Sequence, residues 1–395
     1  MKKFTVKDID LKGKKVIMRV DFNVPLDEKL NITDDRRIQA ALPTIRYVLD
    51  QGAAKLILMS HLGRPKGEVK EEFRLKPAAK RLQELLKEDV LRLDDCIGKE
   101  VKEAIEKASQ RIILLENLRF HKEETKNDPT FSKELASLAE VYINDAFGSA
   151  HRAHASTSGI TEYLPSVAGF LLEKEIEFLG KAIENPEKPF VVILGGAKVS
   201  SKIALIENLL SKVDTIIIGG GMVYTFLKAL GKNIGGSLLE PDYIDTAKTI
   251  LEKAKAANVT IALAEDFVIT ESFDKPEGRK IVSGEIPDGW EGVDVGPETR
   301  KKFKDILSTA KTVVWNGPVG VFEVDGFHEG TKEIGEYLSH LRGVTSIVGG
   351  GDTAAAVAKF NMEEGMTHIS TGGGASLELL EGKELPGIAA LNDKE

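Results

Sequence analysis

Two lysines in the stretch "VVILGGAKVSSK" (191–202) have a type and a spacing that suggest chemistry. Lys198 and Lys202 are four residues apart where a helix is expected to begin, so they would share one face beside its N-terminus. That end of a helix carries a partial positive charge, which disfavours two lysines unless an anion is bound there. The pair therefore predicts a phosphate or carboxylate ligand, with two solvated lysines as the plain alternative.

Glycine-rich turns recur in the same half of the chain. They read "GGGM" (219–222), "NGPVGVFE" (316–323), "GGGDT" (349–353) and "GGGAS" (372–376). Glycine lets a backbone approach a ligand closely, and the helix that follows offers free N–H groups, with Asp352 or Thr353 as candidate N-caps of one such helix. Neither the GxxxxGK[ST] spacing of a P-loop nor an early GxGxxG is present, so the turns predict a nucleotide site of another kind, although each alone could be an ordinary tight turn.

Cationic side chains follow the apolar stretches of the first half instead. The relevant segments are "DFNVP" (21–25) with "DDRR" (34–37) downstream, "HLGRP" (61–65), "NLRFH" (117–121) and "AFGSAHRAHAS" (146–156). Arginine binds phosphate and carboxylate through two parallel hydrogen bonds, whereas a single loop arginine is usually only a solvated charge. Their joint occurrence predicts a small polyanionic ligand that also carries hydroxyl groups.

These residues need a scaffold that gathers them, and the pattern of apolar runs supplies one. Short β-branched runs alternate with helical stretches; they cover 15–20, 55–60, 111–116, 140–145, 190–195, 215–220, 260–265, 312–317, 345–350 and 368–373. Near-continuous apolar strands that alternate with helices indicate parallel sheets covered on both faces. In such sheets ligands bind beyond the carboxyl ends of the strands, where the segments above would lie.

The length of 395 residues and an uneven composition predict two domains. Most arginines lie before residue 166, whereas most of the 37 glycines lie after it. Between the halves, 164–189 has apolar residues at helical spacing and a proline near each end. We therefore expect an α/β protein of two doubly wound, Rossmann-like domains, 1–165 and 186–375, joined by a linker helix over 166–185.

Composition narrows the function further. The formal net charge of −8 argues against non-specific nucleic-acid binding, and no apolar run is long enough to cross a bilayer. Cys96 is the only cysteine, so neither an intrachain disulfide nor a multi-cysteine zinc site is possible. No signal peptide is evident at the N-terminus. We expect a cytoplasmic protein without a nucleic-acid or membrane partner, and a monomer.

The motifs as a set resemble the phosphoglycerate kinase family. The matching stretches are "RVDFNVP", "ITDDRRI", "SHLGRP", "LENLRFHKEE", "NDAFGSAHRAHAS", "LGGAKVSSKI", "TVVWNGPVGVFE", "IVGGGDTAAA" and "STGGGASLELLEGK", in family order from residue 19 to 383. The resemblance implies reversible transfer of a phosphoryl group between 1,3-bisphosphoglycerate plus ADP and 3-phosphoglycerate plus ATP, with Mg²⁺. It also implies that a tail, 376–395, returns to the N-terminal domain. Small departures from the family pattern occur at Ser149, Ser201 and Val319.

Site residues carry over from the family position by position. The resemblance implies catalytic roles for Arg36, Lys198 and Gly373, with Gly372 and Gly374 beside the last of these. The implied phosphoglycerate site is Asp21, Phe22, Asn23, Arg36, His61, Leu62, Gly63, Arg64, Arg119 and Arg152. The implied nucleotide site is Lys198, Lys202, Gly292, Asn316, Glu323 on the ribose, Gly350, Gly351, Asp352 and Thr353, with Asp352 also the metal ligand.

The chemistry explains why this set contains few acids and bases. The nucleophile is a carboxylate, which has a pKa of about 4 and is ionised at neutral pH without a general base. The barrier is then mainly charge repulsion, which Arg36, Lys198, Mg²⁺ and the glycine-rich helix ends would reduce. Hinge closure at the linker helix and around "STGGGAS" would bring the ligands together and exclude water. Two alternatives remain open: a non-catalytic nucleotide-binding protein of this fold, and a kinase for another carboxylate such as acetate.

Overall fold

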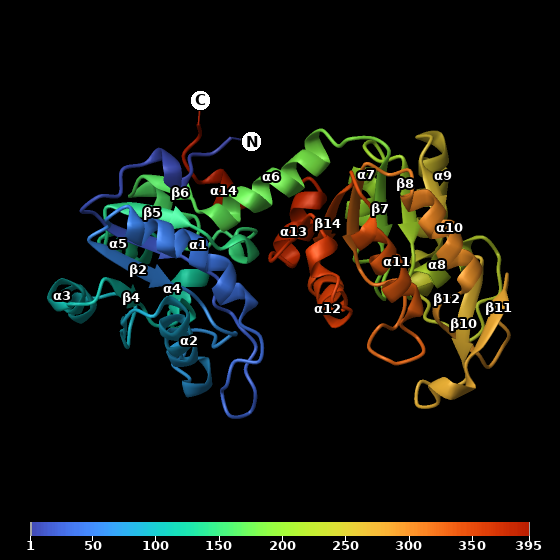
Figure 1. Ribbon diagram of the computed structural model, residues 1–395, viewed down its shortest axis with the longest axis horizontal. Helices are drawn as coiled ribbons and strands as arrows, with labels where there is room; N and C mark the ends of the chain where they lie inside the picture. Colours follow the sequence, from blue (N-terminus) through green and yellow to red (C-terminus); the bar gives the residue numbers. More distant parts are fainter. Residues whose placement is uncertain (1, 395) are drawn as a thin grey trace. The chain divides into compact units, whose positions relative to one another are not determined.

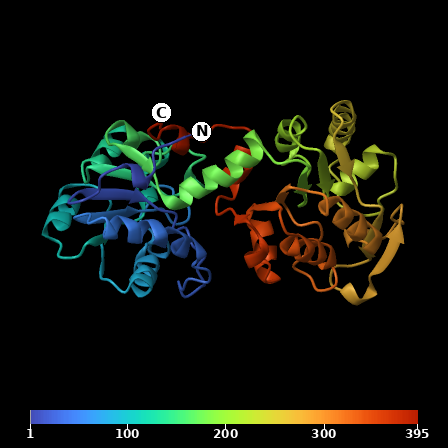
Figure 2. The same cartoon turned by 45° about the horizontal axis from the view of Figure 1, so that its top comes forward.

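The computed structural model describes residues 2–394, and the chain divides into two compact units (Figure 1). The first unit extends to Glu177 and takes in the chain again from Glu384 onward, while the second is Phe178–Lys383. Each unit is built on its own parallel sheet with helices packed around it (Figures 1 and 2). None of the described helices is long and apolar enough to span a bilayer.

The first unit contains a six-stranded parallel sheet in the order β3-β4-β2-β1-β5-β6. Its strands are β1 (Lys15–Arg19), β2 (Lys55–Met59), β3 (Val90–Arg92), β4 (Ile112–Leu114), β5 (Val141–Asn144) and β6 (Ser166–Ala168). Its helices are α1 (Arg36–Asp50), α2 (Lys76–Leu86), α3 (Lys99–Lys107), α4 (Lys122–Thr125), α5 (Pro129–Ala136) and α14 (Pro386–Ala389), with the 3₁₀ turn η3 at Leu118–Phe120. The four strands expected in this half all form.

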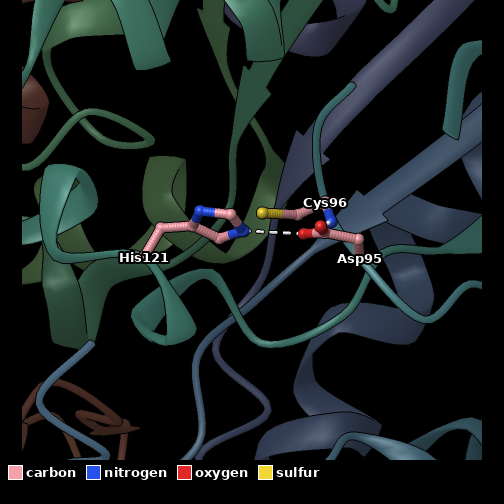
Figure 3. A group of neighbouring side chains, drawn as sticks. All are labelled: Asp95, Cys96 and His121. Atoms are coloured by element: carbon pink, nitrogen blue, oxygen red, sulfur yellow. Dashed lines mark hydrogen bonds and ion pairs between the residues drawn. The ribbon is translucent and has the colours of Figure 1, made fainter. Parts of the chain in front are cut away.

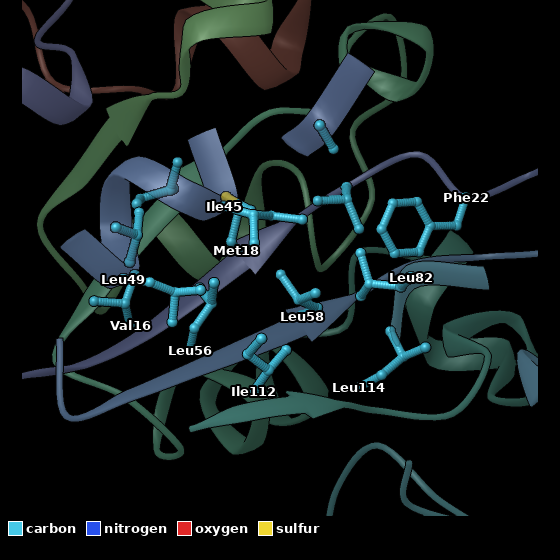
Figure 4. Packing of buried hydrophobic residues seen from close by; sticks show 14 of the residues in the cluster. Val16, Met18, Phe22, Ile45, Leu49, Leu56, Leu58, Leu82, Ile112 and Leu114 are labelled. Carbon is cyan, nitrogen blue, oxygen red and sulfur yellow. The ribbon is translucent and has the colours of Figure 1, made fainter. Parts of the chain in front are cut away.

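The core of the first unit lies between this sheet and the helices α1 and α2 (Figure 4). Val16 and Met18 of β1 and Leu56 and Leu58 of β2 are fully buried on it. β-Branched and long aliphatic side chains suit a parallel sheet, because both of its faces are covered. Burying one such side chain is worth about 1.5–3 kcal/mol, so the core fixes the strand register and with it the position of each strand end.

The second unit contains another six-stranded parallel sheet, in the order β15-β14-β13-β7-β8-β9. Its strands are β7 (Phe190–Leu194), β8 (Thr215–Ile218), β9 (Thr260–Ala262), β13 (Thr312–Asn316), β14 (Thr345–Gly349) and β15 (His368–Ile369). Its helices are α7 (Ile203–Leu209), α8 (Val223–Ala229), α9 (Ile244–Ala256), α10 (Pro297–Leu307), α11 (Glu329–His340), α12 (Gly351–Lys359) and α13 (Gly374–Leu380). The six strands expected in this half form, which confirms two doubly wound α/β domains.

A smaller antiparallel sheet in the second unit was not predicted. It has the order β11-β10-β12, with β10 (Asp266–Thr270), β11 (Lys280–Ser283) and β12 (Glu291–Val295). Most of β11 is exposed and β10 carries polar residues at both ends, so neither looks like the apolar runs of the main sheets. Val268, Val293 and Phe327 form its small core.

Two local expectations were wrong in detail. The segment expected to be helical from residue 166 begins as the edge strand β6, and α6 (Phe170–Glu184) starts only after it. Asp352 and Thr353 do not cap α12; Gly350 is the N-cap, with a φ of 91° that glycine adopts without strain. The Thr353 hydroxyl instead accepts a hydrogen bond from Gly317 N–H at 2.7 Å, so it ties α12 to the turn after β13.

Candidate functional site

The cationic segments of the first unit follow β1, β2, β4 and β5, which are neighbours in the sheet order β4-β2-β1-β5. Parallel strands end at one edge, so their turns lie side by side there. Hydrogen bonds join the turns directly. Gly63 N–H donates to Asn23 Oδ1 at 2.9 Å, Arg119 Nη1 donates to Gly63 O at 2.9 Å, and Phe22 N–H donates to Ser60 Oγ at 2.8 Å. The predicted residues of three strand ends therefore form one connected surface.

Arg19, the last residue of β1, is fully buried and fixes the state of His61. Its Nη2 lies 2.9 Å from His61 Nδ1. A guanidinium group can only donate, so Nδ1 must accept and the neutral imidazole carries its proton on Nε2. Burial first, and then the charge of Arg19, lower the pKa of His61 well below its usual range. His61 is thus held as a neutral Nε2–H donor.

Arg19 has its own support from a buried acid. Its Nε donates to Ser156 Oγ at 2.9 Å, and the Ser156 hydroxyl donates in turn to Glu124 Oε1 at 2.6 Å. Ser156 N–H donates to the other Glu124 oxygen at 3.0 Å. Glu124 is fully buried, so a chain of hydrogen bonds runs from this carboxylate through Ser156 to Arg19 and His61.

Asp21 is held by a residue that the sequence did not single out. Arg37 Nη1 pairs with Asp21 Oδ2, and Asp21 Oδ1 accepts from Asn23 N–H at 3.1 Å. The carboxylate is mostly buried, so a charge-assisted pair of this kind orients it firmly. Arg36, next in the chain, behaves differently: its guanidinium donates to both carboxylate oxygens of Asp34, and its side chain is half exposed.

Positive charge is concentrated at this edge, as the pKa values of its buried and half-buried groups show. Burial, together with Arg19 and Arg152, lowers the pKa of Arg119 to about 10, and Arg119 Nε is buried without a hydrogen-bond partner. Burial and the nearby Arg119, Arg19 and Arg152 lower the pKa of His154 to about 3. His154 Nδ1 is likewise buried and unpartnered. Buried polar atoms left without a partner are costly, and Arg119 Nε can only donate, so this edge of the sheet can still bind an anion.

The remaining arginines lie on the exposed side of this region. Arg64 and Arg152 are exposed and, with Arg119, line a cavity of about 370 Å³ that also includes Lys66, Lys122 and Lys126. Leu62 is buried, and its carbonyl accepts from Asn117 Nδ2 at 2.7 Å, which anchors the turn after β2. The arrangement can hold a ligand with several negative charges, because flexible cations lie beside preorganised ones.

In the second unit the glycine-rich turns pack directly against one another. Gly195 N–H donates to Asn316 O at 3.0 Å, and Gly220 N–H donates to Val319 O at 2.8 Å. A Cβ atom on Gly195 would lie 2.0 Å from the Pro318 carbonyl oxygen, so only glycine permits this approach. The turns after β7, β8 and β13 therefore form one compact floor.

Lys202 and Lys198 occupy different positions on this floor. α7 begins at Ile203 with Lys202 as its N-cap, so Lys198 precedes the helix and the two do not share a helical face as expected. Lys202 Nζ donates to Asn316 Oδ1, and burial lowers the pKa of Lys202. Lys198 is exposed. A half-buried lysine beside the floor and an exposed one next to it can contact an anion at different depths.

The other predicted nucleotide residues are spread over the second unit. Gly350 and Gly351 begin α12, with the exposed Asp352 in its first turn, and Gly373 is the N-cap of α13. Gly292 belongs to β12 of the antiparallel sheet, where its N–H donates to Ser237 Oγ at 2.9 Å. Glu323 is exposed, and no hydrogen bond described for the structure joins it or Gly292 to the lysine turn.

Both the sequence and the fold of the chain are similar to those of known proteins. The sequence agrees with the family described as phosphoglycerate kinase over residues 6–383. The chain belongs to the phosphoglycerate kinase family. Phosphoglycerate kinase from Coxiella burnetii is 41% identical with a TM-score of 0.89, and the enzyme from Pyrococcus horikoshii OT3 is 34% identical with a TM-score of 0.84. In both cases 98% of each chain is covered.

Membership in the phosphoglycerate kinase family identifies the reaction. These enzymes reversibly transfer a phosphoryl group between 1,3-bisphosphoglycerate and ADP, giving 3-phosphoglycerate and ATP, a step of glycolysis. The chain is therefore a phosphotransferase whose acceptor is a carboxyl group. This assignment excludes the two alternatives, a non-catalytic nucleotide-binding protein and a kinase that acts on acetate.

The structure gives supporting positions to residues that were outside the predicted set of contact residues, although Arg37 and His154 lie in the cationic segments noted in the sequence. Arg19, Arg37, Glu124 and His154 lie at the anion edge of the first unit, and Glu240 accepts from both Ser200 N–H and Ser200 Oγ beside the lysine turn. One signal was available for Arg19, since a charged residue at the end of an apolar strand needs a buried partner. Nothing in the sequence marks Glu124, because its partners come from segments distant along the chain.

Proposed function

We propose that the cationic edge of the first unit binds 3-phosphoglycerate or 1,3-bisphosphoglycerate. The observation that carries this is the convergence of Arg19, Arg119, His61 and His154 at the ends of adjacent strands, where burial and the charges of Arg19 and Arg119 lower the pKa of both histidines. The ligand-contacting residues in this proposal are Asp21, Phe22, Asn23, Arg36, His61, Leu62, Gly63, Arg64, Arg119 and Arg152. Asp21 and Asn23 would accept from the ligand hydroxyl or position it, while the arginines neutralise the phosphate.

The nucleotide, in our proposal, binds over the glycine floor of the second unit. Lys202 would contact the nucleotide phosphates, and Asn316, Gly350, Gly351 and Thr353 would form the surface around them. Glu323 would bind the ribose, and Gly292 would allow close approach of the nucleotide. Support comes from the packed glycine turns and from the free N–H groups at the start of α12.

Mg²⁺ would be held with the nucleotide by Asp352. An exposed carboxylate fits this ion, which keeps several waters and takes one or two carboxylates together with substrate phosphates. When bound, the ion would neutralise phosphate charge. Every other contribution in the proposal comes from side chains and backbone groups of the chain itself.

The chemistry that we propose is charge neutralisation around a phosphoryl group in transit. The carboxylate of 3-phosphoglycerate attacks the terminal phosphorus of ATP and ADP leaves, so no general base is required. Arg36 and Lys198 would contact the transferring group, with the N-terminus of α13 at Gly373 facing it. His61, held as an Nε2–H donor by Arg19, would orient the acceptor rather than exchange a proton.

The two substrates must meet with water excluded, so we propose hinge closure between the units. α6 includes the division between Glu177 and Phe178, and the turn around Gly373 precedes the return of the chain to the first unit at Glu384. Backbone changes at these two places could bring the ligands together. We further propose a cytoplasmic monomer, in keeping with a glycolytic step; sedimentation equilibrium of the purified chain tests the oligomeric state.

The deciding experiment measures ADP formation from ATP and Mg²⁺ with 3-phosphoglycerate, glycerate or acetate as acceptor. We expect turnover with 3-phosphoglycerate alone; none with it would overturn the proposal. Lys198→Ala should lower kcat at least about a hundredfold without unfolding the protein, as expected for charge stabilisation of the reacting group. Lys228→Ala, an exposed lysine on α8, is the matched control and should keep its kcat.

A further inference from the structure

Three side chains with different metal-ligand chemistry meet away from the strand ends of β1 and β5. They are Asp95, Cys96 and His121, and a carboxylate oxygen, the sulfur and an imidazole nitrogen all lie within 4.8 Å of one another. Figure 3 shows the thiol and the carboxylate both directed toward the imidazole ring. His121 Nε2 lies 2.7 Å from Asp95 Oδ1. In the part of the chain that the structure describes, no other histidine, cysteine or carboxylate group converges in this way.

The backbone holds these three residues in place. Asp95 and Cys96 belong to the loop between β3 and α3, where Leu93 N–H donates to Leu114 O at 3.0 Å and Glu116 N–H donates to Asp95 O at 3.3 Å. His121 follows η3, and its N–H donates to Leu118 O at 3.2 Å. Its ring packs on Phe131 with centroids 5.3 Å apart. Ligands on such anchored segments lose little entropy when they bind an ion.

We propose that Asp95, Cys96 and His121 bind a Zn²⁺-type divalent cation, with a water molecule in the fourth position. Ligands at about 2.0–2.3 Å around a tetrahedral ion are about 3.3–3.6 Å apart. The three atoms already lie within 4.8 Å, so side-chain adjustments suffice, chiefly an opening of the 2.7 Å gap between His121 and Asp95. The site is distinct from the magnesium site proposed at Asp352.

The choice of metal follows from the ligands. A sulfur and an imidazole select zinc and similar transition metals, whereas Mg²⁺ and Ca²⁺ prefer oxygen alone. The Asp95 side chain is 53% exposed and that of His121 is 27% exposed, so an ion and its water can enter, while Cys96 is buried. Three protein ligands with a water molecule in the fourth position characterise an open zinc site rather than a closed structural one.

Binding requires proton release. Burial and the neighbouring Asp95 raise the pKa of the Cys96 thiol well above its usual range, so the sulfur is protonated in the free protein. As the metal–sulfur bond forms, the thiol proton passes to the buffer. The proton on His121 Nε2 passes to Nδ1 of a neutral ring, or to the buffer from an imidazolium, so that Nε2 binds the ion as a neutral imidazole nitrogen. The charge of the ion replaces those protons, and no electron is transferred.

Cobalt titration tests the site without reference to catalysis. Co²⁺ added to the full-length protein in excess Mg²⁺ should bind one equivalent and produce a thiolate-to-cobalt charge-transfer band with the visible bands of a tetrahedral ion. Zn²⁺ should displace it. Cys96→Ser should abolish the charge-transfer band, and His121→Gln should weaken Co²⁺ binding at least about tenfold.

Asp94→Asn is the control, because it changes a carboxylate in the same loop but leaves the three proposed ligands in place; Asp94 pairs with Arg92 at 2.6 Å. It should retain both the band and the affinity. A protein without the band, or a band that survives in folded Cys96→Ser, would overturn the proposal. If a variant fails to fold, the unaltered protein still tests the proposal. Zn²⁺ should displace Co²⁺ from it and abolish the charge-transfer band, and a band that persists in excess Zn²⁺ would overturn the proposal. The readout does not depend on the substrate site, so failure here leaves the proposed function intact.

Discussion

Arg19 provides the sharpest test of how the anion edge is built. Arg19→Met keeps the length and apolar stem of the side chain but removes the guanidinium. The lost interactions include two well-formed bonds at 2.9 Å, to Ser156 Oγ and to His61 Nδ1. Hydrogen bonds that involve a charged group are worth about 1.5–3 kcal/mol each, and Glu124 would lose its buried counter-charge. We expect the free energy of unfolding of the first unit to fall by about 3–5 kcal/mol.

The second effect of Arg19→Met concerns His61. Without the guanidinium donor, the imidazole loses its preference for the Nε2–H form, and its pKa rises because a nearby positive charge has gone. ¹⁵N NMR of the two ring nitrogens measures the tautomer, and hydrogen exchange of the β1 and β5 amides measures local stability. With 3-phosphoglycerate, KM should rise more than kcat falls.

The control for this experiment is Arg46→Met, since Arg46 is an exposed arginine on α1 that donates to Leu85 O at 3.0 Å. Its free energy of unfolding should change by less than about 1 kcal/mol. Glu124→Gln combined with Arg19→Met should cost less than the sum of the two single changes, because the buried charges are removed together. Loss below about 1 kcal/mol in Arg19→Met, with His61 still in the Nε2–H form, would refute the reasoning.

Three further outcomes follow from other groups. His154 should stay neutral in an NMR titration down to pH 4, because its pKa is lowered to about 3. The unfolded chain takes up this proton more readily, so the free energy of unfolding should fall as pH falls from about 6.5 toward 3. A titration midpoint of His154 near pH 6.5 would contradict this prediction. Lys202→Met should weaken ADP binding at least about tenfold by calorimetry with its circular dichroism unchanged; equal affinity would exclude a phosphate contact. Burial raises the pKa of Asp294 to about 7, above its value in the unfolded chain, so the free energy of unfolding of the second unit should fall as pH rises from about 4 to 7. Asp294→Asn should reduce this pH dependence, measured by urea unfolding at several pH values. An unchanged pH dependence would argue against the burial effect.

Much of the scaffold could be predicted because its signals are local. Apolar β-branched runs located all ten expected strands, and their turns identified the edge of each sheet. The antiparallel sheet escaped because its strands, such as β11, are largely exposed and their stability comes from pairing with distant segments. The N-cap of α12 was predicted at Asp352 or Thr353, but it is Gly350. Glycine adopts the positive φ found there without strain, so the helix begins before the two residues whose side chains suggested a cap.

The support of the site could not be predicted from spacing. Arg19, Ser156 and Glu124 come from three segments, and only the folded sheet shows that they share hydrogen bonds. Residue type and spacing do not distinguish Lys198 from Lys202, and only the family resemblance gave Lys198 a catalytic role; in the structure Lys198 is exposed and Lys202 is half buried against Asn316. The two lysines differ in burial and in hydrogen-bond partners, which residue type alone does not predict.

Mapping each substrate separately tests most directly whether the two units divide the reaction between them. Amide NMR spectra should be recorded with 3-phosphoglycerate alone and with Mg²⁺ and ADP alone. We expect 3-phosphoglycerate to shift amides in the turns after β1, β2, β4 and β5, and ADP to shift those after β7, β8, β13 and β14. Shifts from both ligands in the turns of one unit, or 3-phosphoglycerate shifts confined to the second unit, would contradict the account.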